Sequence, residues 1–298
     1  MRNIAIVGAG KVGSVLGRVL VENGQEIACI VSRTKKSAQA AGRFLKCKNV
    51  SDSLGAIPAT TDLIYITTPH AVVAGVALAL SRLDHLRFKR LSVCHASGML
   101  TAEVLEPVRQ RGATVFSFHP LQTFPRDFSS KDIVPTATGI YYAVDGTPQA
   151  IKRAKVFARK LAGKVIEIKP EMRAFYHAAC VVASNHLTTL LSILESMFKE
   201  FGSNEKGFFP IFKPIIMATL RNAEATSPAT ALSGPVARGG VETVADHFIA
   251  IKRFAPELLP YFGTLTLETL KLAETKGSIA EERATALRNL VQSYTHQT

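Results

Sequence analysis

The sequence of 298 residues contains no tryptophan and only four cysteines, at positions 29, 47, 94 and 180. No two of them form a CxxC pair, the spacing typical of zinc and redox sites, so we expect no metal site and no disulfide framework. The longest apolar run without a charge, near residues 72–80, is too short to cross a bilayer. The first residues already have a strand pattern, which is not that of a signal peptide. Together these absences predict a cytoplasmic protein with no membrane partner.

Acidic residues are also few: there are 23 Asp and Glu against 36 Lys and Arg, a formal net charge of +13. The basic residues stand in short, scattered runs, which is typical of solvated faces. The alternative is a positive field that attracts phosphates and carboxylates. Nucleic-acid binding would need a basic stripe with interleaved aromatic residues, and aromatic residues make up only 7%. We therefore expect a small acidic ligand and no nucleic-acid partner.

Apolar strands and amphipathic helices alternate through the first half of the chain, which predicts an α/β fold with a doubly wound parallel sheet covered on both faces. The expected strands are 3–7, 27–31, 63–67, 91–95, 114–118, 139–144 and 165–168, and the helices between them are 11–23, 36–45, 71–83, 101–111 and 148–161. From residue 171 onward the pattern is helical only, over 171–201, 205–224, 240–254, 256–275 and 279–295. We therefore expect domains at 1–168 and 169–298, the second of them all-α.

A glycine turn follows the first expected strand. Gly8, Gly10 and Gly13 fit GxGxxG, between an apolar strand and a helix. In this setting the glycines permit a tight turn, close approach of a pyrophosphate and close helix–strand packing. The alternative is a tight turn without a ligand. We expect a Rossmann domain whose dinucleotide lies on the whole turn: Gly8, Ala9, Gly10, Lys11, Val12 and Gly13.

The end of the second strand indicates which dinucleotide binds. NAD sites usually carry Asp or Glu there, on the ribose hydroxyls. This chain has Ser32, Arg33 and Thr34, with no carboxylate between residues 31 and 36. Ser32 can bond a 2′-phosphate, and Arg33 can pair with it or stack on adenine. The expected cofactor is therefore NADP(H).

Four further motifs carry a family resemblance: VCHASG at 93–98, SFHPLQTF at 117–124, YHAACVVASNHLTTLL at 176–191 and LSGPVARGG at 232–240. With the glycine turn, they resemble the DUF2520 Rossmann-like oxidoreductases over nearly the whole chain. That family is similar in architecture to ketopantoate reductase, pyrroline-5-carboxylate reductase and the 6-phosphogluconate dehydrogenase group. The resemblance implies a nicotinamide-dependent reductase. It also implies a 6-phosphogluconate dehydrogenase C-terminal-like helical domain that mediates a homodimer.

The sequence departs from the ketopantoate reductase pattern at two positions. Aligning Asn185 with the asparagine of those enzymes places His177 where they have a catalytic lysine. The DUF2520 family commonly has Asp after Arg-Gly, and here Gly240 stands instead. These departures put direct transfer of the ketopantoate mechanism in doubt.

Reduction of a carbonyl or imine needs a proton donor and an anchor for the acidic group of the substrate. His177, or otherwise His119, is the expected donor, and Asn185 assists; each histidine could instead be structural. Arg238 is the expected carboxylate clamp. Ser184 and Thr243 are further candidates for substrate contact. Residues that end neighbouring strands are expected to border the cofactor, namely Thr67, Thr68, Pro69, His95, Ser97 and Gly98.

These observations predict an NADP(H)-dependent reductase of a small carboxylate-bearing 2-oxo acid, with ketopantoate-like substrates first, or of an imine. A pyrroline-type imine reductase shares the architecture. The alternative from another class is a non-catalytic NADP(H)-binding sensor or regulatory protein.

Overall fold

The computed structural model describes residues 3–124, 135–201 and 207–295. The chain forms two compact units, Met1–His186 and Leu187–Thr298. This boundary lies further along the chain than the expected one at 168/169. The reason is that Arg173, after the expected boundary, is buried in the first unit against Asp145 and Ser97.

Six parallel strands form the main sheet of the first unit, in the order β3-β2-β1-β4-β5-β6. This is the strand order of a Rossmann fold and confirms the predicted fold class. The strand β3 has only two residues, and the sequence analysis did not predict it. The strands are β1 (Ile4–Val7), β2 (Ile27–Val31), β3 (Val50–Ser51), β4 (Leu63–Ile66), β5 (Ser92–His95) and β6 (Thr114–Ser117).

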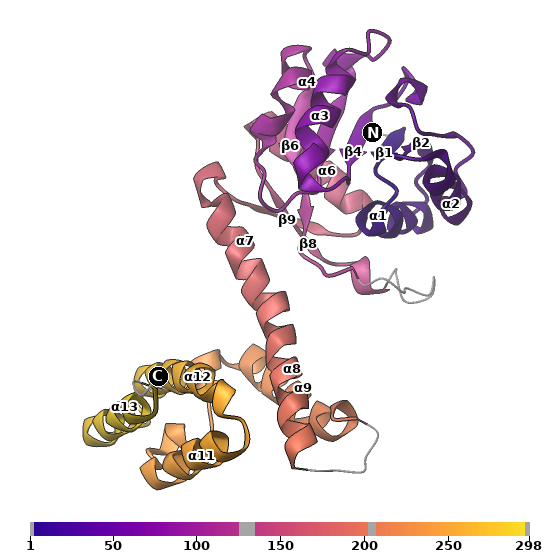
Figure 1. Ribbon diagram of the computed structural model, residues 1–298. Helices are drawn as coiled ribbons and strands as arrows, with labels where there is room; N and C mark the ends of the chain where they lie inside the picture. The colour runs from indigo at the N-terminus through magenta and orange to yellow at the C-terminus, as the bar shows by residue number, and fades with distance from the viewer. Residues whose placement is uncertain (1–2, 125–134, 202–206, 296–298) are drawn as a thin grey trace. The chain divides into compact units, whose positions relative to one another are not determined.

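Helices cover both faces of this sheet because side chains alternate along each strand. In β1, Ile4 and Ile6 pack with one core cluster, and Ala5 and Val7 pack with the other. The first cluster includes residues of α1 (Lys11–Glu22), α2 (Lys35–Leu45) and α6 (Pro148–Lys160). The second includes residues of α3 (His70–Ser81), η3 (Ala102–Leu105) and α4 (Glu106–Gln110) (Figure 1). Two short 3₁₀ turns complete this part, η1 (Leu54–Ala56) and η2 (Phe88–Arg90).

A second, three-stranded sheet lies in the same unit. It contains β7 (His119–Pro120), β8 (Tyr141–Val144) and β9 (Lys164–Glu167). β8 pairs antiparallel with β7 and parallel with β9. The strands expected at 139–144 and 165–168 therefore form a separate sheet. β7 follows β6 after a single residue, so this small sheet fixes His119 next to the end of the main one.

The second unit is helical, as expected. Its core includes Val244, Phe248, Leu270, Leu287 and Val291. Its described residues contain no strand, and residues 202–206, which include the expected start of a helix at 205, lie outside the described part of the chain. The helices are α8 (Leu187–Glu200), α9 (Phe209–Ala225), α10 (Pro228–Ala231), η6 (Val236–Arg238), α11 (Val241–Phe254), η7 (Pro256–Leu258), α12 (Leu259–Lys276) and α13 (Glu281–Thr295).

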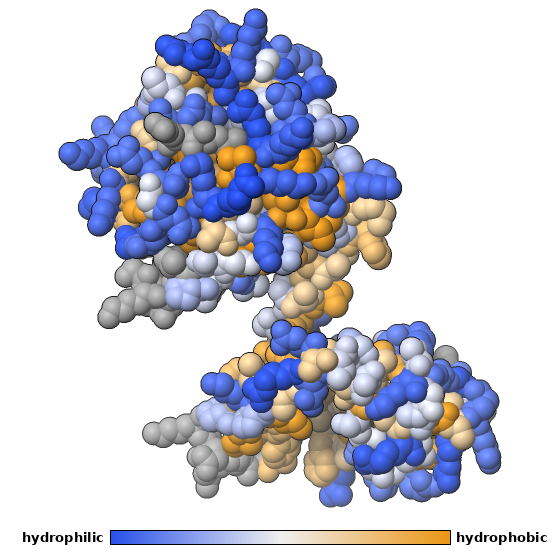
Figure 2. All heavy atoms as spheres, turned by 180° about the vertical axis from the view of Figure 1, so that it is seen from behind, coloured by the Kyte–Doolittle hydropathy of each residue, from blue (hydrophilic) through white to orange (hydrophobic). Residues whose placement is uncertain are grey.

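One helical stretch, Pro170–Glu200, is both long and apolar. It contains η4 (Pro170–Met172), α7 (Arg173–Val181), the π-helical turn η5 (Val182–His186) and α8. By length and composition alone it could cross a membrane, which the sequence analysis did not anticipate. Figure 2 shows apolar side chains along its exposed surface. An exposed apolar face of this kind is typical of an interaction surface.

Candidate functional site

The glycine turn joins β1 to α1 and is held closely against the end of β4. Gly8 has a φ of +113°, and a Cβ there would lie 2.8 Å from the backbone of Thr67. The hydroxyl of Thr67 donates to Gly8 O at 2.7 Å. A Cβ on Gly13 would lie 2.5 Å from Thr67 Oγ1 and closer still to Gly8 O. The first and third glycines are therefore required by the packing of the protein itself.

Gly10 differs from these two glycines because its surroundings are open. A Cβ there would meet nothing within 4 Å among the described residues. Gly10 is also the N-cap of α1 and has no side-chain cap in the structure described, so the helix presents free N–H groups at this point. Close by in the fold, after β4, the hydroxyl oxygen of Thr68 is buried without a hydrogen-bond partner among the described residues. An open cradle with free donors and an unsatisfied hydroxyl fits a dinucleotide pyrophosphate.

This difference between glycines gives a direct test. We expect Gly10→Ala to keep the melting temperature of wild type and to lose dinucleotide affinity by at least tenfold, because the new methyl occupies only ligand space. Gly13→Ala should lower the melting temperature, because its methyl collides with Gly8 and Thr67. Calorimetric titration and thermal melts measure both effects. Unchanged affinity in Gly10→Ala would contradict the assignment of this turn.

At the end of β2, the three expected cofactor residues have different surroundings. Thr34 caps α2, since its hydroxyl accepts from Ser37 N at 3.2 Å. Arg33 is exposed. Ser32 N donates to Ser51 O at 3.0 Å, so β3 ends beside it. Asp52 follows Ser51 in the chain, and the sequence analysis did not count this carboxylate because β3 was not expected.

His95, predicted to border the cofactor, is fully buried at the end of β5. Its Nε2 contacts Thr101 O at 3.0 Å, and its Nδ1 accepts from Ser97 N at 3.2 Å. This arrangement requires the neutral ring with its proton on Nε2. Both ring nitrogens are thus bonded to backbone, and the His95 side chain shapes the loop that carries Gly98. Ser97 also shapes this loop, because its hydroxyl accepts a hydrogen bond from Leu100 N at 3.2 Å.

Burial lowers the pKa of His95 from 6.5 to about 4. The unfolded chain therefore binds a proton at His95 near pH 6.5, whereas the folded chain binds it only near pH 4. The free energy of unfolding should accordingly fall as the pH drops from 6.5 to 4, by roughly 3 kcal/mol from this residue. Urea unfolding across this range measures the slope. His95→Gln should reduce the slope, and exposed His186→Gln should not; equal slopes in all three proteins would refute the assignment.

Three segments meet around Gly98. A Cβ on this buried glycine would lie 3.0 Å from His119 Nε2 and would overlap the ring of His177. The two imidazole rings have centroids 6.1 Å apart. His119 comes from β7 and His177 from α7. The structure therefore brings together the two histidines that the sequence offered as alternatives.

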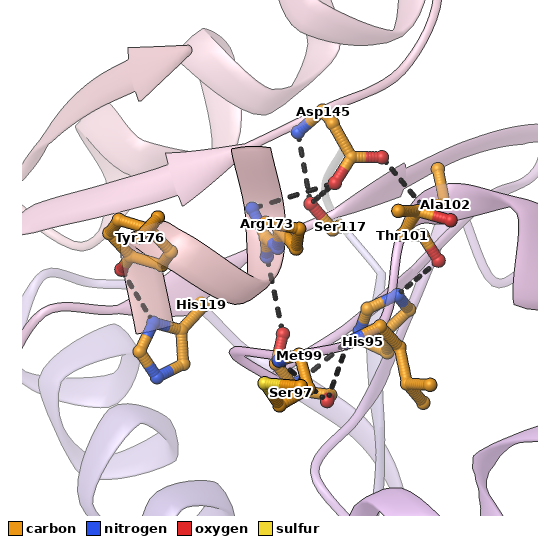
Figure 3. A network of polar contacts seen from close by, with 11 residues as sticks. His95, Ser97, Met99, Thr101, Ala102, Ser117, His119, Asp145, Arg173 and Tyr176 are labelled. Atoms are coloured by element: carbon orange, nitrogen blue, oxygen red, sulfur yellow. Dashed lines mark hydrogen bonds and ion pairs between the residues drawn. The ribbon is translucent and has the colours of Figure 1, made fainter. Parts of the chain in front are cut away.

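Tyr176 joins this cluster and was not anticipated. Its hydroxyl lies 2.7 Å from Nδ1 of His119 (Figure 3). Burial, with additional effects of Arg173, His177 and His95, lowers the pKa of His119 from 6.5 to about 4. His119 is therefore neutral at physiological pH. Burial also raises the pKa of Tyr176, so its hydroxyl stays protonated.

A buried ion pair holds the start of α7 in place. Arg173 is 1% exposed, and its Nη1 lies 3.5 Å from the Asp145 carboxylate. Its Nη2 donates to Ser97 O at 3.2 Å. Asp145 also accepts from Ala102 N at 2.6 Å and from the Ser117 hydroxyl. Figure 3 shows how these bonds tie α7 to the ends of β5 and β6.

This network fixes the histidine cluster, and the sequence analysis missed it. Arg173, Asp145 and Tyr176 were not among the residues it singled out. The available signal was a charged residue next to an apolar strand, at Asp145, and a lone arginine at the start of an apolar helix.

The remaining expected residues belong to other elements. Ser184 and Asn185 belong to the π-helical turn η5, where the Ser184 hydroxyl donates to Asn185 Oδ1 at 2.8 Å. π-helical turns are frequent at functional sites. Arg238 ends η6 and Thr243 lies on α11; both are exposed and belong to the second unit. Pro69, at the N-terminus of α3, is exposed at the end of β4.

Comparison with known families agrees with the two-part organisation. Residues 2–120 match the model of the Rossmann-like domain. Residues 140–269 match the model of DUF2520, a domain of unknown function. The chain therefore carries a Rossmann-like domain followed by a DUF2520 domain, which confirms the resemblance drawn from its motifs. A search of curated proteins finds no match.

Solved structures share this fold at low sequence identity. A candidate NADP oxidoreductase from Bacteroides fragilis is 20% identical, covers 91% of this chain and 98% of its own, and has a TM-score of 0.71. A protein from Thermotoga maritima is 19% identical, with coverages of 91% and 99% and a TM-score of 0.70. A pyrroline-5-carboxylate reductase from Coxiella burnetii is 14% identical, with coverages of 99% and 98% and a TM-score of 0.58.

Proposed function

We propose that this chain of Rossmann-like and DUF2520 domains is a nicotinamide-dependent oxidoreductase that reduces a small carboxylate-bearing 2-oxo acid or imine. One observation carries the proposal: the rings of His119 and His177 meet at Gly98, at the edge of the sheet that carries the glycine turn. Enzymes on the same fold include a pyrroline-5-carboxylate reductase, whose activity belongs to the reductase class.

The order of the strands supports this proposal. The glycine turn follows β1, Thr68 follows β4, Gly98 follows β5, and His119 follows β6. Because all these strands are parallel, their carboxyl ends share one edge. Neighbouring strands are about 4.8 Å apart, so the turn and the histidines are separated by roughly 14 Å along that edge. Ligands of open α/β sheets bind along this edge.

A bound reduced nicotinamide would supply a hydride. The protein's residues then have separate tasks. The glycine turn and Thr68 would hold the dinucleotide. His119, kept neutral by burial, would donate a hydrogen bond and then a proton to the carbonyl oxygen or imine nitrogen. The His177 ring lies beside that of His119, and the missing side chain of Gly98 allows both rings to pack against this glycine. From the sequence pattern alone, Arg238 remains the predicted clamp for the carboxylate, with Asn185, Ser184 and Thr243 as further predicted contacts.

A substrate panel tests this proposal. Purified protein should oxidise NADPH in the presence of ketopantoate-like 2-oxo acids or cyclic imines such as pyrroline-5-carboxylate. Competition between the two groups decides which class is preferred. His177→Ala and His119→Ala should each lower kcat, and exposed His186→Ala should not. Dinucleotide binding without turnover of any of these compounds would favour a non-catalytic sensor instead.

We propose NADP(H) as the preferred dinucleotide because Ser32 and Arg33 end β2. We expect Arg33→Ala to lose the preference for NADPH over NADH, by tenfold or more in the ratio of Kd values. Asp52→Asn is the matched control at the end of β3 and should keep the preference. Tighter binding of NADH that is lost in Asp52→Asn would reverse the assignment.

We propose further that two copies associate through α8 and α9. In the described chain, α9 has no buried residue and α8 has only Phe198. Ile215 is 64% exposed and Phe201 is 62% exposed. An apolar pocket of about 220 Å³ adjoins this face and includes Met197, Phe201 and Phe254. Such a face is typical of an obligate interface.

A membrane is the other surface that could cover these helices. We favour a second copy because Lys213, Arg221 and Glu224 lie on α9, and charges inside a bilayer are costly. Light scattering should give twice the chain mass, and Ile215→Asp should give monomers. Val156→Asp, an exposed apolar position of α6, is the matched control. Flotation with liposomes as a monomer would favour the membrane.

A further inference from the structure

The Tyr176 hydroxyl, 2.7 Å from Nδ1 of His119, determines which proton His119 can give away. We propose that Tyr176 is a positioning residue behind His119: its O–H donates to Nδ1, fixes the ring proton on Nε2, and replaces that proton during turnover. The inference rests on the proposed reductase function, because it assigns the proton supply of that same site.

The geometry of the ring supports this direction of the hydrogen bond. In a neutral imidazole one nitrogen carries the proton and the other accepts. Nε2 of His119 points towards Gly98, 3.0 Å from the position that a Cβ would take there, and glycine has no side chain to receive a hydrogen bond. With Tyr176 donating to Nδ1, Nε2–H faces the space where a carbonyl oxygen would lie. With the opposite direction, an acceptor nitrogen would face the substrate oxygen and repel it.

The surroundings of Tyr176 suit a hydroxyl that gives up its proton and then takes one back from solvent. The tyrosine remains protonated because burial raises its pKa. Its ring lies 5.5 Å from the Arg173 guanidinium, whose positive charge stabilises a transient phenolate. Tyr176 and Cys180, one helical turn further on, are both partly exposed, so this end of the cluster borders solvent.

A bound reduced nicotinamide would supply the hydride to the carbonyl carbon, and the C=O π electrons would then move to oxygen. That oxygen takes the Nε2 proton of His119. Nδ1 of His119 takes the Tyr176 proton, so the imidazole is again neutral and the tyrosine becomes a phenolate. A solvent proton restores Tyr176, and reversal of the ring tautomer restores His119. The substrate thus gains one hydride and one proton.

Nitrogen NMR of histidine-labelled protein tests the hydrogen bond without any substrate. Long-range ¹H–¹⁵N spectra distinguish Nε2–H from Nδ1–H rings, and His119→Asn identifies the resonances. We expect His119 to be an Nε2–H ring between pH 6 and 8. In Tyr176→Phe the Nδ1 resonance should shift to that of an unbonded nitrogen, and the Nδ1–H ring should become populated. An Nδ1–H ring in the wild-type protein would overturn the proposal.

Kinetics test the supply of the proton separately. Tyr176→Phe should lower kcat by at least about tenfold with little change in KM, because proton transfer in the transition state contributes factors of this size or more. The solvent deuterium isotope effect on kcat should rise. Tyr141→Phe removes the same atom from an exposed tyrosine and is the matched control. Wild-type kcat and isotope effect in Tyr176→Phe would refute the relay.

The two measurements separate this inference from the proposed function. If no 2-oxo acid or imine is reduced, the reductase proposal fails, and the ring tautomer still decides the direction of the Tyr176–His119 bond. If reduction occurs with an Nδ1–H ring, the reductase proposal stands and the relay is wrong.

Discussion

Gly98→Ala is expected to abolish turnover and to leave a folded protein that still binds dinucleotide. The added methyl would overlap the His177 ring and lie 3.0 Å from His119 Nε2. Both rings come from other segments and would have to move from their present positions. Displacement of reacting groups by about 1 Å can cost about 100-fold in rate. We therefore expect kcat to fall at least 100-fold, with a dinucleotide Kd close to that of wild type, because the glycine turn is untouched.

Gly75→Ala is the control for this substitution. Gly75 lies on α3, where a Cβ would meet nothing within 4 Å among the described residues. This variant should be as active as wild type and slightly more stable, since alanine favours a helix more than glycine does. If Gly98→Ala retained wild-type kcat, the two histidine rings at Gly98 would not belong to the reacting site. The measurements are steady-state kinetics, calorimetric titration and a thermal melt.

Asp145→Asn should destabilise the first unit by about 3–5 kcal/mol, because it leaves Arg173 charged, buried and without its carboxylate. Burial already lowers the pKa of Arg173, and Asp145 is the principal group that opposes this effect. The backbone donor of Ala102 also loses a charged acceptor. Urea unfolding measures the loss of free energy.

Two further variants separate the ion pair from general damage. Asp145→Asn combined with Arg173→Met removes both charges, and we expect it to lose less than the sum of the two single variants. Lys155→Met breaks an exposed ion pair with Glu167 and should change stability by at most about 1 kcal/mol. If the double variant lost the full sum of the unfolding free energies lost by the two single variants, Asp145 and Arg173 would act independently.

The fold was largely predictable because its signals are local. The apolar runs at Ile4–Val7 and Leu63–Ile66 are long enough to identify buried parallel strands. β3 was missed, since two residues cannot establish a pattern. The strands at 139–144 and 165–168 were predicted, but their place in a second sheet depends on β7, which is only His119 and Pro120. Tertiary contacts determine which strand a short strand pairs with. The sequence of the short strand alone does not specify that partner.

The domain boundary illustrates the same limit. The change from alternating strands to continuous helix is visible at residue 169, but the compact units divide at His186/Leu187. α7 has the periodicity of a helix, yet Arg173 binds it to the first unit. A single buried charge whose partner is Asp145, distant in sequence, cannot be recognised from helix periodicity.

By itself the sequence determined the glycine turn, the parallel sheet, the helical second part and the list of candidate histidines. Each of these follows from spacing along the chain, because strand and helix periods and the φ angles of glycine are local properties. The tertiary structure decided which histidine is structural and which ones meet. Both ring nitrogens of His95 are hydrogen-bonded to the backbone. His119 and His177 meet at Gly98, and the Tyr176 hydroxyl lies next to Nδ1 of His119. Burial and neighbouring charges then set the protonation of His119, and both arise only when segments far apart in the sequence are packed together.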